Sequence, residues 1–220
     1  LAHAYKTPLT AIRAASTGLS EPGRQYPAQA ELVCLIDEQA TVLNDLTARL
    51  LTTARLDAGE ISVNAKSIRV AALIEEVVAS LKDRLANTKV NIVLPDAELE
   101  LCCDHRLMSM LLTQYIDNAG KYSTFGSTVT IRAERMKSEM MLSVHSFGPV
   151  IPMADRERIF DRYYRSSNSS NRAAGTGIGL AVAKRAAVIH GGHVWVTSDE
   201  NDGTAFFAAI PISDTQRKTK

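Results

Sequence analysis

The chain has 220 residues, which is enough for one large domain or two small ones. With 45% hydrophobic and 22% charged residues, it has the composition of a globular protein and not of a disordered one. The 25 basic and 24 acidic residues leave a net charge of +1, so the charge gives no indication of binding to nucleic acid or to an anionic membrane surface.

Cysteine usage and hydropathy indicate a chain in a reducing compartment. Cys34, Cys102 and Cys103 cannot form a disulfide framework and lack the spacing of zinc ligands. No stretch approaches the roughly 20 apolar residues that cross a bilayer, and no signal peptide is visible. Because Leu1 already lies inside a helical pattern, we expect the chain to be a segment of a longer protein.

The first part of the chain predicts a helical hairpin. Apolar residues recur three and four positions apart over residues 1–19, where Pro8 should kink the helix, and again over residues 29–58 as a coiled-coil-like seam. A lone hairpin buries little apolar surface, so pairing with a second copy into a four-helix bundle would complete it. The apolar positions are Leu9, Ile12, Ala15 and Leu19 in the first helix and Leu32, Ile36, Leu43, Leu46 and Leu50 in the second.

After Gly59 the pattern changes to that of an α+β domain. Asp104 is the expected N-cap of one helix, and Gly191 with Gly192 should end another. We expect a sandwich in which helices cover one face of a mixed, mostly antiparallel sheet. The predicted helices span 70–86, 104–122 and 180–190, and the predicted strands span 90–94, 99–102, 129–131, 141–144, 193–197 and 205–208.

A glycine-rich segment could hold a phosphate. Gly175, Gly177 and Gly179 alternate before a predicted helix, where backbone N–H groups and the positive end of the helix can approach an anion. The alternative is a simple tight turn. The long polar loop before these glycines argues against a dinucleotide-binding Rossmann unit, whose glycines follow a strand directly.

Two further features could carry phosphoryl chemistry. Gln114, Asn118 and Lys121 share one helix face, where an amide oxygen suits Mg²⁺ and an ammonium can neutralise phosphate charge. A solvated polar helix face is the alternative interpretation. His3 carries an imidazole that can take a phosphoryl group on nitrogen, although a single histidine is more often an ordinary surface residue.

Taken together, five segments resemble the sequence boxes of the sensor histidine kinases of two-component systems. They resemble the H box at 1–10, the N box at 114–121, the G1 box at 147–152, the F box at 158–165 and the G2 box at 175–180. The order and the spacing match, and the resemblance covers essentially the whole chain. Five ordered motifs are far more specific than any one of them.

The resemblance implies a fold and a reaction. Residues 1–58 resemble the dimerisation and histidine-phosphotransfer hairpin, and residues 66–213 resemble the Bergerat-type ATPase domain, with a linker at 59–65 and a flexible tail at 214–220. The implied reaction uses ATP and Mg²⁺ to phosphorylate a histidine, which then passes the phosphoryl group to the receiver domain of a response regulator. The implied location is the cytoplasm, with a membrane reached only through segments outside this chain, as in the cytoplasmic portion of an inner-membrane receptor.

The resemblance also assigns roles to single residues. His3 takes the phosphoacceptor position, and Thr7 takes the position associated with dephosphorylating the regulator. Asn118 takes the position of the Mg²⁺ ligand. The residues assigned to the ATP pocket are Gln114, Asn118, Lys121, Tyr122, Ser146, Gly148, Ile151, Gly175, Thr176, Gly177, Gly179 and Leu180.

Four departures from the family pattern touch chemistry. Ala4 stands where the family has an acidic residue that helps deprotonate the imidazole, a general-base contribution of about 10²–10⁴-fold. Ser146 replaces the Asp that accepts a hydrogen bond from adenine, Val150 replaces a glycine where we expect a positive φ, and Gln114 replaces an Asn. We therefore expect a weakened kinase. The alternative is a degenerate member that binds ATP poorly and acts as a response-regulator phosphatase or an interaction module.

Overall fold

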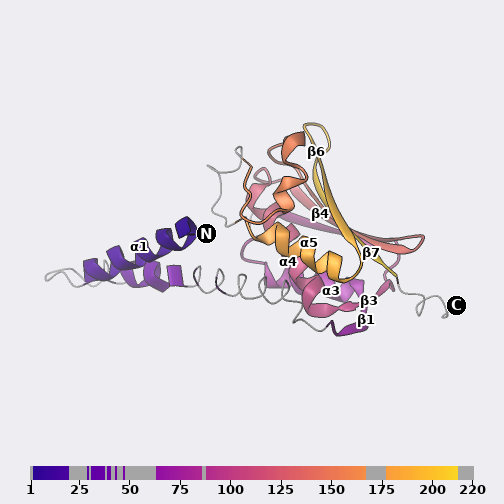
Figure 1. The fold of residues 1–220 in the computed structure, drawn as a ribbon, viewed down its shortest axis with the longest axis horizontal. Coiled ribbons are helices and arrows are strands. Elements are labelled where there is room, and N and C mark those ends of the chain that lie inside the picture. Colours follow the sequence, from indigo (N-terminus) through magenta and orange to yellow (C-terminus); the bar gives the residue numbers. More distant parts are fainter. Residues whose placement is uncertain are drawn as a thin grey trace. The chain divides into compact units, whose positions relative to one another are not determined.

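The computed structural model describes residues 2–19, 29, 31–37, 39, 40, 43, 47, 63–85, 88–166 and 177–212. The chain divides into two compact units, Leu1–Glu60 and Ile61–Lys220. The described residues of the first unit are helical, and those of the second unit build two sheets with helices between their strands (Figure 1).

The first unit contains the first of the two predicted helices. Helix α1 (Ala2–Leu19) runs through Pro8, and its stripe residue Ala15 is buried at 1% exposure. Leu9, on the same predicted stripe, is 53% exposed in the single chain. Of the second predicted helix, residues 31–37 are helical, and most of the rest of 29–58 lies outside the described residues.

The second unit is built on a five-stranded sheet in the order β2-β4-β5-β7-β6. Only β2 and β4 pair in parallel, and every other neighbouring pair in this sheet is antiparallel. The mixed, mostly antiparallel sheet that the sequence predicts is therefore confirmed. The strands are β2 (Lys89–Val93), β4 (Thr128–Met136), β5 (Glu139–Ser146), β6 (His193–Asp199) and β7 (Gly203–Pro211).

Helices α3 (Val70–Ser80), α4 (His105–Tyr122) and α5 (Gly179–Ile189) lie together on one face of this sheet (Figure 1). Helix α4 packs against both α3 and α5, which makes it the middle of the helical layer. Its residues Leu107, Leu111 and Tyr115 are completely buried against the sheet. The Tyr115 hydroxyl donates to the Phe207 carbonyl oxygen of β7 at 2.9 Å, so the one polar atom that this ring brings into the core is paired.

The helix caps follow the sequence. Asp104 is the N-cap of α4, where its side chain accepts hydrogen bonds from the backbone N–H groups of Leu107 at 3.2 Å and Asn64 at 3.0 Å. Burial acts to raise the pKa of Asp104, but these N–H groups outweigh it, so the pKa lies below its ordinary value. At the end of α5, Gly191 adopts a φ of 73° and its N–H donates to the Val188 carbonyl oxygen, as expected of a glycine that ends a helix.

Two elements differ from the sequence-based prediction. Helix α3 ends at Ser80, whereas a helix over 70–86 was expected, and residues 81–85 form turns. Strand β1 (Ala65–Arg69) was not predicted, and it pairs antiparallel with β3 (Glu100–Asp104) in a separate two-stranded sheet. This small sheet leads into α3 on one side and into α4 on the other.

Candidate functional site

The candidate site is arranged around the second half of α4. Gln114 is buried at 8% exposure, the Lys121 side chain is 35% exposed, and Asn118 lies between them on the helix with intermediate burial. Residues three and four positions apart share a helix face, so these side chains follow one another along α4 from the interior towards the solvent.

Helix α5 begins directly against this face. A Cβ on Gly179, its first residue, would overlap the Oε1 atom of Gln114, so any larger residue there would require the buried Gln114 side chain to move. The N-cap residue Ile178 makes no side-chain cap hydrogen bond to the first turn of α5. The helix N-terminus, with its partial positive charge, therefore meets α4 one turn before Asn118, which is a suitable place for a phosphate group.

The turn after β5 packs against the other end of α4. A Cβ on Gly148 would overlap the backbone oxygen of Tyr122, the last residue of that helix. The N–H of Thr124 donates to the Phe147 carbonyl oxygen at 2.7 Å. Ser146 precedes this turn as the last residue of β5 and is buried at 7% exposure.

A polar network fixes the far side of the same turn. The Ile151 N–H donates to the Ser198 hydroxyl at 2.9 Å, and that hydroxyl is 2.6 Å from the hydroxyl of Thr204. The Arg156 guanidinium donates to the carbonyl oxygens of both Ile151 and Ser198. The turn is thus held by β6 and β7 as well as by α4.

Gly177, where the described part of the glycine-rich segment begins, is held against the residues that follow the short helix η2 (Arg158–Phe160). The N–H of Tyr163 donates to the Gly177 carbonyl oxygen at 2.8 Å, and a Cβ on Gly177 would lie 2.8 Å from the Tyr163 carbonyl carbon. Both residues have a positive φ, 63° for Tyr163 and 68° for Gly177. A tyrosine in this region is strained, and such strain is often found at functional sites.

Asp155 connects the residues after η2 to the short helix η1 (Met153–Asp155). Its two carboxylate oxygens accept hydrogen bonds from the Tyr164 hydroxyl at 2.6 Å and the Ser166 hydroxyl at 2.5 Å. Those two bonds lower the pKa of the Asp155 carboxyl group. The Arg158 guanidinium carbon lies 4.4 Å from the centre of the Tyr164 ring, which adds a cation–π contact.

Two family models match two separate segments of the chain. The model of the His kinase A (phospho-acceptor) domain matches residues 1–59, and that of the histidine kinase-, DNA gyrase B- and HSP90-like ATPases matches residues 103–214. The chain belongs to the sensor histidine kinases of two-component systems. The resemblance inferred from the five sequence boxes is therefore confirmed.

Known histidine kinases support this assignment. Sensor histidine kinase WalK of Bacillus subtilis is 31% identical over 98% of this chain, which spans 36% of the length of WalK. Histidine kinase AdeS of Acinetobacter baumannii has the same fold, with a TM-score of 0.72 at 21% identity over 94% of this chain and 96% of that chain. Histidine kinase ThkA in complex with response regulator protein TrrA gives a TM-score of 0.72 at 20% identity over 98% of this chain and 61% of that chain.

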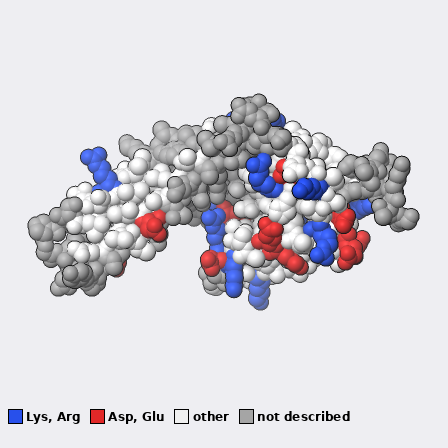
Figure 2. All heavy atoms as spheres, turned by 90° about the horizontal axis from the view of Figure 1, so that it is seen from below, with Lys and Arg blue, Asp and Glu red and all other residues white. Residues whose placement is uncertain are grey.

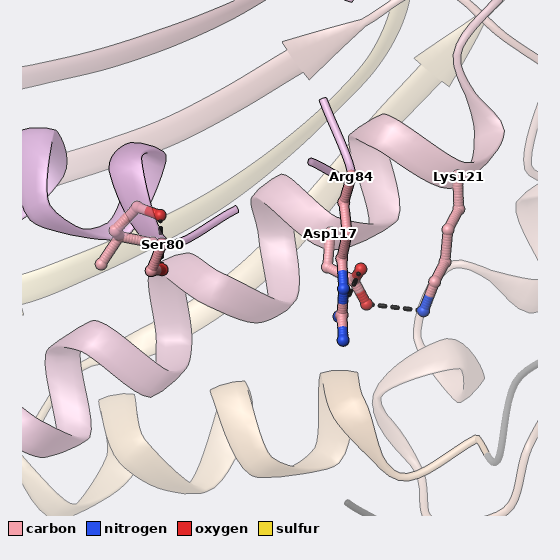
Figure 3. Close-up of polar contacts among 5 residues, drawn as sticks. Ser80, Arg84, Asp117 and Lys121 are labelled. Atoms are coloured by element: carbon pink, nitrogen blue, oxygen red, sulfur yellow. Dashed lines mark hydrogen bonds and ion pairs between the residues drawn. The ribbon is translucent and has the colours of Figure 1, made fainter. Parts of the chain in front are cut away.

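In the second unit, three charged side chains meet at α4 (Figure 3). Asp117 is buried, with 3% of its side chain exposed, and accepts from Lys121 Nζ at 2.6 Å and from Arg84 Nη1 at 3.0 Å. Burial acts to raise the pKa of Asp117, but the two cations outweigh it and lower that pKa. The N-box interpretation included Lys121 but gave no role to Asp117, which lies in the same box. It could not include Arg84, which lies outside all five boxes.

The structure brings most of the predicted pocket residues together around α4. Gln114 meets Gly179, Gly148 meets Tyr122, and Ile151 lies in the same turn as Gly148. Gly175 and Thr176 lie outside the described residues. His3 and Thr7 belong to α1 in the first unit, where Thr7 is exposed and the His3 side chain is outside the described part.

One expectation for the G1 turn is wrong. Val150 was expected to occupy a position that needs a positive φ, but its φ is not positive. Among the described residues other than glycine, a positive φ occurs at Lys137 and Tyr163. Val150 therefore carries no left-handed strain. The sequence also gave no signal for the Ser198 and Arg156 bonds, because they join segments that are far apart in the chain.

The remaining surface features add no second candidate. Among the described residues no group of three or more His, Cys, Asp or Glu side chains could hold a metal ion. No helix in the described part of the chain is long and apolar enough to cross a membrane. Figure 2 shows basic and acidic side chains interspersed over one face, in keeping with the small net charge.

Proposed function

We propose that this chain binds ATP in its second unit, transfers the γ-phosphoryl group to His3, and passes it on to a response regulator. The observation that carries the proposal is the meeting of three sequence boxes at α4. Gly179 lies against Gln114 and Gly148 lies against Tyr122, on either side of Asn118. Segments that are far apart in sequence thus border one helix face that bears an amide and an ammonium.

The two ends of this arrangement suit the two ends of ATP. The phosphates would lie at the N-terminus of α5, near Gly177, Gly179 and Leu180, where helix N–H groups and Lys121 favour negative charge. The adenine would lie at the G1 turn, beside Ser146 and Gly148, with Tyr122 and Ile151 lining the nucleotide. Gly175 and Thr176 complete the pocket in this proposal. The Ser146 hydroxyl would replace the usual carboxylate as acceptor from the adenine amino group.

The donor set fits Mg²⁺ that takes most of its ligands from substrate phosphates and water. Asn118 offers one amide oxygen from the partly exposed face of α4, and an oxygen ligand is what this hard cation prefers. The described residues hold no carboxylate cluster that could form an all-protein site. When bound, Mg²⁺ would neutralise phosphate charge and orient the γ-phosphoryl group.

The first unit would supply the acceptor and the partner surface. A nitrogen of the His3 imidazole would attack the γ-phosphorus as the bond to the ADP oxygen breaks, and a receiver aspartate would later take the phosphoryl group. Thr7, one turn along α1, would orient water when the regulator is dephosphorylated. The exposed stripe residue Leu9 supports pairing of two hairpins into a four-helix homodimer. The solved complex of ThkA with response regulator TrrA supports docking of a receiver domain.

We further propose that the activity is weakened. Ala4 provides no carboxylate to assist His3, and Ser146 offers an uncharged acceptor to adenine. The second candidate, a member that binds ATP poorly and acts as a phosphatase or interaction module, is favoured by the same two departures. The phosphate-side packing of Gly179 favours the kinase.

Labelling with ATP tests the kinase directly. Purified chain incubated with γ-labelled ATP and Mg²⁺ should acquire an acid-labile, base-stable label, which His3→Gln should abolish. His105→Gln is the matched control, because His105 is an exposed histidine of the second unit with 47% side-chain exposure. Labelling that survives in His3→Gln would exclude His3 as the acceptor.

Two further measurements test ATP binding, which separates the kinase from its alternative, and dimerisation. Calorimetry should detect ATP binding to the wild-type chain, and no measurable affinity would favour the phosphatase or interaction module. Light scattering should report a dimer, whereas a monomer over the full concentration range would contradict residues 1–58 as a sufficient dimerisation unit.

A further inference from the structure

The buried carboxylate beside the proposed Mg²⁺ ligand has two cationic partners. Asp117 Oδ2 accepts from Lys121 Nζ at 2.6 Å, and Asp117 Oδ1 accepts from Arg84 at 3.0 Å (Figure 3). We name Arg84, Asp117 and Lys121 the Asp117 cluster. Two positive charges on one negative charge leave the cluster with a net charge of +1.

Arg84 reaches the cluster from outside the sequence boxes. It belongs to the turns that follow α3, and this segment packs on the proposed nucleotide helix α4. A Cβ on Gly120 would lie 3.2 Å from Leu85 Cδ2 and 3.5 Å from the Arg84 carbonyl oxygen, so the turns after α3 lie directly against α4. This packing places the Arg84 guanidinium beside the Asp117 carboxylate.

The position of Asp117 creates an electrostatic problem for the site. Lys121 is proposed to attract the nucleotide phosphates, yet a carboxylate at 2.6 Å would cancel most of its field if the two groups formed an isolated pair. Because Asp117 is only 3% exposed, water screens its charge poorly. A second cation on the same carboxylate offsets this loss.

We propose that Arg84 is a positioning residue for nucleotide binding, the counter-charge of Asp117 that preserves the attraction of Lys121 for phosphate. This inference rests on the proposed ATP site and assigns a role to a residue outside it. Asp117 accepts a hydrogen bond from one of the three N–H groups of the Lys121 ammonium and thereby orients it. Arg84 keeps the net charge of the cluster at +1. Arg84 thus acts on the nucleotide through Asp117 and Lys121.

The charge count predicts an unusual pattern of variants. Arg84→Gln lowers the net charge of the cluster from +1 to 0, so ATP affinity should fall about three- to tenfold, the size of one partly screened charge. Arg84→Gln combined with Asp117→Asn restores +1 and should restore the affinity. Arg84→Lys retains the charge and should remain close to the wild type.

The measurement is calorimetric titration of the full chain with ATP and, in parallel, with adenosine. Adenosine affinity should be the same in all variants because it has no phosphate, and the loss in Arg84→Gln should shrink at high salt. Arg132→Gln is the matched control, since it removes the same charge from an equally exposed arginine, that of the Arg132–Glu134 pair (3.9 Å) on β4. A thermal melt of each variant ensures that binding is compared among folded proteins.

The outcomes separate the two proposals. If the wild type binds ATP and Arg84→Gln binds it equally well, the inference about Arg84 is wrong while the proposed function stands. If the double variant binds as weakly as Arg84→Gln, or if adenosine affinity falls in parallel, Arg84 has only a structural role and the inference is again wrong. If the wild type does not bind ATP, the proposed function is overturned and this inference with it.

Discussion

The two sides of the proposed nucleotide site depart from the family pattern to different extents. On the phosphate side Gln114 replaces an Asn, but Gly177 and Gly179 are retained, and a Cβ on them would collide with Tyr163 and with Gln114, respectively. On the adenine side, Ser146 and Val150 replace family residues. Steric constraint is thus strong where the motif is retained.

The adenine side nevertheless has a well-supported turn. Gly148 packs on the backbone of Tyr122, while Ser198 and Arg156 hydrogen-bond to the backbone of Ile151. These contacts hold the turn without a carboxylate at 146 or a glycine at 150. The departures therefore alter what the turn offers to a base and leave its backbone supported. The substitutions below test this difference.

Gly179→Ala should have the largest effect, because it adds a Cβ where the buried Gln114 amide lies. We expect a loss of about 1–3 kcal/mol of stability from overpacking, with weaker ATP binding. A second substitution, Gln114→Asn, withdraws the amide by one methylene and should recover much of the lost stability and of the lost ATP affinity. Urea unfolding and calorimetry measure the two quantities.

Gly120→Ala is the matched control for this substitution. Its new Cβ would lie 3.2 Å from the flexible end of Leu85, so it should be tolerated, and alanine is favoured over glycine in a helix by up to about 1 kcal/mol. Equal stability of Gly179→Ala and the wild type would contradict the steric account of the phosphate side.

Asp104→Ala should weaken α4 at the end away from both sides of the site. Loss of the N-cap should cost about 1–2 kcal/mol and leave ATP affinity unchanged. Because the folded pKa of Asp104 is lowered, its charge-dependent stabilisation is present above the unfolded value of about 3.9 and is lost as pH falls through the folded pKa. Unfolding of wild type and variant across acidic pH should therefore show a shrinking difference.

Asp104→Asn is the control, since an amide oxygen still caps the helix but does not titrate. It should cost less than Asp104→Ala, and its stability should depend less on pH than that of the wild type. A fall in ATP affinity in either variant would mean that a change at the start of α4 alters the nucleotide site at its other end. The phosphate side and the adenine side could then not be compared independently.

The elements with strong periodicity were predictable from the sequence, and the boundaries set by tertiary contacts were not. Strands β4 and β5 largely alternate buried residues with less buried ones, and Asp104 marks the start of α4. The end of α3 was missed because Leu81 and Leu85 are buried and continue the apolar spacing into turns. Strand β1 was missed because Ile68 is its one residue that is not fully exposed, so it shows no alternation.

The candidate site shows the same division. Motif resemblance identified Gln114, Asn118 and the glycines, because their chemistry is concentrated in short segments. It could not identify Arg84 or Arg156, whose partners are 33 and 42 residues away in the chain. Motif resemblance also gave no reliable prediction of backbone angles, since Val150 does not have the positive φ expected from the G1 box.

Ser146→Asp should strengthen the adenine side. A charge-assisted hydrogen bond exceeds a neutral one by about 1 kcal/mol, so ATP affinity should rise about fivefold. Since residue 146 is 7% exposed, the new carboxylate should also lower the stability of the nucleotide-free chain. Calorimetry with ATP and with GTP, which has no adenine amino group, tests this, and unchanged ATP affinity would contradict the alignment of the G1 turn.

Val150→Gly should have the smallest effect. Because Val150 does not have a positive φ, glycine relieves no strain there, and ATP affinity should stay within about twofold of the wild type. The added freedom of the unfolded chain should lower stability by about 0.5–1 kcal/mol. A several-fold gain in affinity, measured by the same calorimetry, would mean that the turn changes its backbone angles when a nucleotide binds. The adenine side would then be limited by backbone geometry as well as by the missing carboxylate.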